Sequence, residues 1–191
     1  RGPGGRRSRA AAGGGAIADP RGLVRRTVAE FAELGLTPQV GPELEFFLID
    51  DSGGQLRVPP SPRSGKRRTG AETLSLRALD AFDSFFTDLY DACEAMDVPA
   101  DTAISEAAPG QFEINLMHQP DPLKAADDAW LFKQLVKGLA RQYGFAGSFM
   151  AKPYEDFAGN GLHVHNRLVR NGASTIVKKD GINDTGRRLV A

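Results

Sequence analysis

Two hydrophobic periods alternate along the chain. Apolar residues recur at helical spacing over residues 20–35, 76–96 and 122–144. The first and third of these stretches follow an aspartate, Asp19 or Asp121, and begin with proline, which is the usual pairing of an N-cap with the first helical residue. The pattern predicts three amphipathic helices.

Between the helices the period changes to two, which is typical of strands. This alternation covers residues 39–50 and 111–116, and we expect two further strands near 145–150 and 162–168. In three of the four segments, side chains that can bind a metal share one face, opposite apolar residues: Glu43 and Glu45, then Glu113, then His163 and His165. The predicted fold is α+β, a curved antiparallel sheet backed by helices, with a polar concave face.

Two segments have no hydrophobic period. Residues 1–18 hold four arginines and no acid among many Gly and Ala, which predicts a disordered tail. Residues 51–75 are rich in Gly, Pro, Ser and basic residues, which predicts a long mobile loop. Its basic run, residues 63–68, raises nucleic-acid binding as an alternative, but a solvated loop is favoured because charges of the two signs balance overall.

The rest of the composition fits a cytoplasmic protein without a membrane segment. No apolar run approaches the length of a membrane span or of a signal peptide. The single cysteine, Cys93, lies within a helical apolar pattern, which indicates a buried, inert thiol and a reducing compartment.

The acid and histidine pattern predicts a divalent-metal site. One strand with alternating charge is usually a solvated face, and either histidine could satisfy a hydrogen bond in a core, but three such strands favour a shared pocket. Residues two apart on a strand are separated by roughly 6.5 Å, a spacing that suits two neighbouring ions. Oxygen ligands with one or two imidazoles favour Mg²⁺ or Mn²⁺ over structural zinc.

Four motifs in register resemble the glutamine synthetase family. They read GPELEFFL (41–48), SEAAPGQFEIN (105–115), FMAKP (149–153) and GNGLHVH (159–165), and the resemblance covers roughly residues 19–190. It implies a ligase that uses ATP to convert glutamate to a γ-glutamyl phosphate, from which ammonia then displaces phosphate to give the amide. The motif wording looks closer to the γ-glutamylpolyamine branch, so a polyamine such as putrescine is the alternative acceptor.

The resemblance also implies site residues. Glu45, Glu106 and Glu113 would hold one metal ion, and Glu43 and His163 would contribute to a second. The expected nucleotide or pocket residues are His165, Gly161 and Gln111. No residue is assigned a catalytic role with certainty.

By the same resemblance, residues 19–191 would be the front part of a catalytic domain, truncated before its C-terminal half. We therefore expect the isolated chain to be inactive. Relatives would form homo-oligomeric rings. Two other classes stay open: a non-catalytic metal-binding module, and a cupin-like or metal-hydrolase barrel, which the long helices disfavour.

Overall fold

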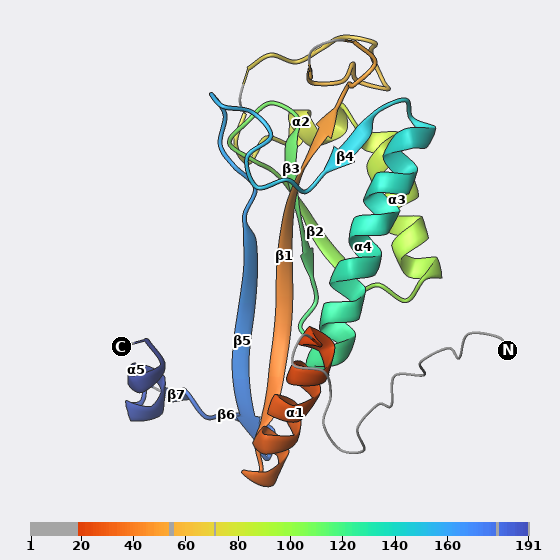
Figure 1. The fold of residues 1–191 in the computed structure, drawn as a ribbon. Helices are drawn as coiled ribbons and strands as arrows, with labels where there is room; N and C mark the ends of the chain where they lie inside the picture. The colour runs from red at the N-terminus through yellow and green to blue at the C-terminus, as the bar shows by residue number, and fades with distance from the viewer. Residues whose placement is uncertain (1–18, 54–55, 71, 179, 191) are drawn as a thin grey trace, which may run out of the picture.

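The computed structural model describes residues 19–53, 56–70, 72–178 and 180–190 (Figure 1). The predicted tail, residues 1–18, lies outside this part of the chain. The helices are α1 (Pro20–Glu33), α2 (Leu76–Asp80), α3 (Asp83–Ala95), α4 (Pro122–Gln142) and α5 (Asp184–Val190). The strands are β1 (Thr37–Ile49), β2 (Ala100–Ser105), β3 (Gln111–Leu116), β4 (Ala146–Ser148), β5 (Leu162–Arg170), β6 (Ala173–Ser174), β7 (Val177–Lys178) and β8 (Gly181–Ile182).

The long strand β1 is the centre of the main sheet. The strand order is β2-β3-β1-β5-β6, and β4 pairs with the end of β1 that β5 leaves free. These pairings are antiparallel, and α3 and α4 lie together beside the sheet (Figure 1). The predicted α+β fold with a curved antiparallel sheet is confirmed.

The apolar faces of β1 and β3 pack under α3 and α4. Leu44, Phe46 and Leu48 belong to one buried cluster with Phe112 and Phe132, as the period of two predicts. The Phe46 ring lies 6.1 Å from the Phe132 ring in an edge-on arrangement. Burial of each such aromatic side chain contributes about 1.5–3 kcal/mol to folding. On the opposite face, β1 carries Glu43 and Glu45, and beyond them Phe47 and Ile49 belong to a second, smaller buried cluster with Ala108.

The first and third predicted helices are confirmed. Asp19 Oδ1 accepts a hydrogen bond from the Gly22 amide (2.9 Å), and Asp121 Oδ1 accepts one from Leu123 (2.9 Å). The single helix predicted over 76–96 is wrong, because the chain forms α2 and α3 with a break at Phe82. There φ is −120°, and the Phe82 ring packs into the core without any glycine or proline to mark the break.

The strand predictions need smaller corrections. β4 covers only Ala146–Ser148 of the expected 145–150, and β5 extends beyond 168 to Arg170. The edge strand β2 (Ala100–Ser105) was not predicted, because its residues are mostly polar or half-buried and show no clean alternation. This strand is important because Glu106 follows it directly.

The predicted loop over residues 51–75, which we call the basic segment, makes specific contacts in its described part. Isolated β-bridges join Asp50 to Arg57 and Pro60 to Arg67. Arginines of the segment pair with acids: Arg63 with Asp80, Arg67 with Asp50 and Arg68 with Glu72. Because these acids balance the arginine charges locally, the contacts favour a folded surface segment over a nucleic-acid-binding site.

The structure also bears on the single cysteine and on the length and polarity of the helices. Cys93 is buried, and burial raises the pKa of its thiol to about 11, as expected for an inert cysteine. Across the described ranges, the helices are too short or too polar to cross a membrane.

Candidate metal centre

Antiparallel register brings the predicted acids and histidines together. Glu45 on β1 stands opposite Glu113 on β3, and Glu43 stands opposite His163 on β5. Directly opposed side chains on one face of a sheet have Cβ atoms about 4.5–5.5 Å apart. Residues separated by as many as 120 positions therefore meet on the polar face.

Glu43, Glu113 and His163 form the tightest group, which we call the carboxylate–imidazole cluster. One potential ligand atom from each lies within 4.8 Å of the others. His163 Nδ1 is 3.1 Å from Glu43 Oε2 and 3.9 Å from Glu113 Oε2. The other Glu43 oxygen, Oε1, is 2.8 Å from His165 Nε2, so this carboxylate contacts both imidazoles.

The cluster concentrates negative charge around Glu113, which is buried, whereas the His163 side chain is 59% exposed. Burial, together with the charges of Glu43, Glu106 and Glu45, raises the pKa of Glu113 to about 7. Burial and the charge of Glu45 also raise the pKa of Glu106. A bound divalent cation would reverse this preference and favour the ionised carboxylates.

Glu45 is oriented by a fully buried glutamine. Gln111 Nε2 lies 3.0 Å from Glu45 Oε2 and 2.9 Å from the Gly159 carbonyl, and donates to both. Gln111 Oε1 accepts a hydrogen bond from the Ala108 amide (3.2 Å). One side chain thus joins β3 to the glycine-containing segment before β5.

Gly161 gives the Glu45 carboxylate its space. A Cβ atom at this position would lie 2.6 Å from Glu45 Oε1, a distance that real Cβ atoms do not show. The Gly161 carbonyl also accepts a hydrogen bond from the Glu45 amide (3.3 Å). The close approach explains the glycine here, where the sequence suggested only a tight turn or a ligand contact.

Glu106 lies near the cluster but outside its tightest group. It is half-buried, directly after β2, and its amide donates to the Gln111 carbonyl (2.9 Å). The predicted division placed Glu113 with Glu45 and Glu106, whereas the structure groups Glu113 with Glu43 and His163. Glu113 therefore lies close to members of both predicted ligand sets, opposite Glu45 on β1 and near His163.

Two further residues face this region without having been predicted as site residues. Asn115 is opposite Glu43 across β1 and β3, and its Oδ1 is buried without a hydrogen-bond partner among the described residues. The His118 ring centroid lies 6.0 Å from that of His165, where the missing side chain of Gly41 leaves room. Asn115 shares the alternating face with Glu113, so the pattern could have suggested it, but no pattern pointed to His118.

The donor set fits a hard divalent cation. Carboxylate oxygens with imidazole nitrogens suit Mg²⁺ or Mn²⁺, and the described part of the chain offers no thiolate here. The buried Asn115 oxygen opposite Glu43, which has no hydrogen-bond partner among the described residues, would gain from a cation or the water bound to it. The arrangement can bind a metal that in turn neutralises phosphate oxygens.

Comparisons with known proteins agree with this chemistry. Residues 17–191 match the model of the glutamine synthetase catalytic domain. The γ-glutamylputrescine synthetase PuuA of Escherichia coli K12 is 38% identical over 162 residues, 83% of this chain and 34% of that protein. The glutamine synthetase of Clostridium saccharobutylicum is 32% identical over 177 residues, 91% of this chain and 38% of that protein.

Solved structures give the same result. A GmaS/ADP complex superposes with a TM-score of 0.75 at 26% identity, covering 87% of this chain and 38% of that one. The crystal structure of a novel glutamine synthase homolog has a TM-score of 0.75 at 25% identity, covering 90% and 38%. The chain thus spans a little over a third of the length of the proteins that it resembles.

Proposed function

Since the chain belongs to the glutamine synthetase family, a family of ligases, we propose that it serves an ATP-dependent carboxylate–amine ligase. The supporting observation is the convergence of Glu43, Glu113 and His163 from three strands. We further propose residues 19–191 as the front part of the catalytic domain. The chain spans only part of the length of its relatives, so their complete activity is likewise something that we propose for it.

The reaction proceeds in two displacements. A γ-carboxylate oxygen of glutamate attacks the terminal phosphorus of ATP, and the bond to the ADP oxygen breaks, which leaves γ-glutamyl phosphate and ADP. The amine nitrogen then attacks the acyl carbon, loses a proton and expels phosphate. Catalysis of such transfers depends mainly on positioning and on charge stabilisation.

The chain's own residues would supply the positioning. Glu43, Glu45, Glu106, Glu113 and His163 would hold Mg²⁺ or Mn²⁺. Such ions, when bound, would offset the charges of the phosphate and carboxylate oxygens. Gln111 keeps the Glu45 carboxylate in place. Glu43 fixes both imidazoles, so His165 would present its ring to the nucleotide phosphates, with Gly161 keeping the backbone close.

The amine acceptor separates two candidates. Ammonia is the acceptor that a glutamine synthetase uses. The 38% identity to a γ-glutamylputrescine synthetase favours a polyamine as the second candidate. A polyamine differs from ammonia in its length and second charge, so the two acceptors need different pockets.

The test is glutamate-dependent ADP release with Mg²⁺ by the protein expressed from its natural open reading frame. Faster release with ammonia than with putrescine would support the glutamine synthetase reaction, and the reverse order would support the polyamine reaction. Glu43→Gln should abolish release in either case. Metal binding without any ADP release would contradict the ligase proposal and favour a metal-binding module.

Two further proposals follow from family membership. We propose that the protein works in the cytoplasm and assembles into a homo-oligomeric ring. Light scattering of the natural full-length protein at a few concentrations tests the assembly, and a monomer at all of them would contradict it.

A further inference from the structure

Ser105, the residue before Glu106, is held on both its side chain and its backbone. The Ser75 amide donates to Ser105 Oγ (2.6 Å), and Oγ donates to the Glu72 carbonyl (2.8 Å). The Leu74 amide donates to the Ser105 carbonyl (2.9 Å). We call these three hydrogen bonds the Ser105 clamp. They tie the end of β2 to residues 72–75, which are 30 or more positions earlier in the sequence.

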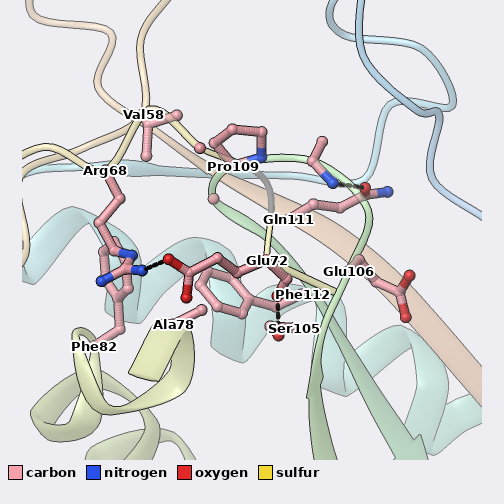
Figure 2. Close-up of a pocket in the computed structure, with 13 residues that line it drawn as sticks. Val58, Arg68, Glu72, Ala78, Phe82, Ser105, Glu106, Pro109, Gln111 and Phe112 are labelled. Carbon is pink, nitrogen blue, oxygen red and sulfur yellow. Dashed lines mark hydrogen bonds and ion pairs between the residues drawn. The ribbon is translucent and has the colours of Figure 1, made fainter. Parts of the chain in front are cut away.

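The far side of the clamp is itself fixed. The Glu72 carboxylate accepts a hydrogen bond from Ser75 Oγ (2.7 Å). It also pairs with Arg68, as Figure 2 shows. Ser75 also caps α2 through the Ala78 amide. The basic segment is therefore attached to the fold at Ser105, the residue before Glu106.

Backbone strain marks the same segment. Leu74 has a φ of 56°, a left-handed conformation that residues other than Gly, Asn and Asp seldom adopt. The residue is 75% exposed, so packing does not explain the conformation. The hydrogen bond from its amide to Ser105 is the contact that this conformation allows. Strained residues of this kind persist where several surrounding contacts hold the backbone in place.

The space behind the clamp does not suit a ligand. The cavity lined by Arg68, Glu72, Ser105 and Glu106 has a volume of about 20 Å³, enough for one water molecule. In Figure 2 the Glu106 carboxylate points away from the Arg68–Glu72 pair. The cavity is thus a small packing gap behind the Ser105 clamp rather than a second binding site.

Alternation along a strand connects the clamp to Glu106. Ser105 pairs with Phe112 of β3, and the hydrogen bond from the Glu106 amide to the Gln111 carbonyl continues this pairing one residue beyond β2. Because neighbouring side chains on paired extended backbone point to opposite sides, holding Ser105 on one side directs Glu106 to the other. Beyond Glu106, the turn is fixed by the hydrogen bond between its amide and the Gln111 carbonyl. Glu106 lies between two anchored positions.

We propose that Ser105 is a positioning residue, which through the clamp holds the Glu106 carboxylate ready for metal binding. This inference rests on the proposed function, because it assigns Glu106 to a metal. It also gives the basic segment a structural part in the site, through Glu72 and Ser75.

The first test is Mn²⁺ binding measured by calorimetry on the whole chain. Ser105→Ala should weaken binding about tenfold, as loss of an outer-shell partner typically does. The matched control is Ser61→Ala, since Ser61 is also buried and its Oγ donates to the Ala81 carbonyl (2.6 Å), which is not part of the Ser105 clamp. It should leave Mn²⁺ affinity unchanged.

A double-mutant cycle separates positioning from general destabilisation. In a Glu106→Gln background, Ser105→Ala should weaken Mn²⁺ binding no further, because Ser105 acts through Glu106. An equal loss in both backgrounds, or an equal loss from Ser61→Ala, would overturn the proposal.

The second test does not depend on a metal. Amide hydrogen exchange at Glu106 and Gln111 should become faster in Ser105→Ala and stay unchanged in Ser61→Ala. If the wild-type chain bound no Mn²⁺, the proposed metal site would be wrong, and exchange alone would decide whether the clamp holds the turn. Unchanged exchange in Ser105→Ala would contradict it.

Discussion

Glu45 and Glu113 stand directly opposite each other across β1 and β3, and among the described residues neither carboxylate forms an ion pair with an arginine or lysine. Like charges at such positions destabilise a sheet. The protein retains this repulsion beside Glu43 and Glu106, whose charges also act on Glu113. In the metal-free state the site therefore lowers the stability of the fold that supports it.

Replacing Glu113 should make that repulsion measurable. The raised pKa of Glu113, about 7 against an ordinary 4.5, means that its ionised form destabilises the folded state above pH 4.5. Glu113→Gln should stabilise the metal-free protein by about 1–3 kcal/mol at pH 8, and the gain should vanish as the pH falls toward 4.5. Urea unfolding in EDTA at several pH values gives the comparison.

A control for this variant is Glu30→Gln on the exposed face of α1, which should change stability little at any pH. Adding Mn²⁺ should stabilise the wild type more than Glu113→Gln, since only binding to the folded state adds stability. A pH-independent effect of Glu113→Gln would contradict the electrostatic explanation.

Gly161→Ala should damage the site more than the fold. The new Cβ would lie 2.6 Å from Glu45 Oε1, so the carboxylate must move away from Gln111. We expect Mn²⁺ affinity to fall about tenfold or more. Gly138→Ala on α4 is the matched control, since its Cβ meets no atom within 4 Å, and it should stabilise the helix by about 0.5–1 kcal/mol with unchanged affinity.

Gln111→Met tests the link between β3 and the segment before β5. The methionine keeps the volume but leaves the Gly159 carbonyl and the Ala108 amide without their partner. Unfolding should become easier by about 1–3 kcal/mol. Gln39→Met, which removes an exposed contact with Arg167, should cost less than about 0.5 kcal/mol. Equal losses in chemical denaturation would show that Gln111 has no special role.

Asp50 should contribute an acid-sensitive part of the stability. Hydrogen bonds from Ser52, together with Arg67, lower the pKa of Asp50 to about 2 from an ordinary 3.8. Its stabilising effect is complete above pH 3.8 and is lost as the pH falls through about 2. Asp50→Asn should thus be less stable than wild type at pH 6, with the difference shrinking toward pH 2. A constant difference in unfolding free energy would exclude this linkage.

Sequence periodicity predicted the parts of the fold in which burial follows a simple repeat. Leu44, Phe46 and Leu48 lie in the core because they share one face of β1, and the opposite face carries Glu43 and Glu45. The break between α2 and α3 could not be predicted, since it depends on the fit of Phe82 to aromatic neighbours such as Phe112.

The residue types of the site could be predicted from the sequence, but the hydrogen bonds that hold those residues in place could not. Motifs identified Glu106, although only the structure shows that Ser105 is anchored to residues 72–75. Such contacts join segments that are distant in the chain, so the local hydrophobic period does not predict them. His118 was missed for the same reason, because its position beside His165 depends on the bridge between Val40 and Gln119 together with the pairing of Gly41 with His165.

Strand β5 carries His163 and His165, yet among the described residues it adds no side chain to the main buried cluster. Its attachment to β1 is mainly a ladder of main-chain hydrogen bonds, and most of its residues are exposed. Local opening of β5 should therefore require less free energy than global unfolding. His163 and His165 can then separate from the carboxylates of β1 and β3 while those two strands stay folded. A bound metal would oppose this separation, because it would join the easily opened strand to the stable part of the sheet.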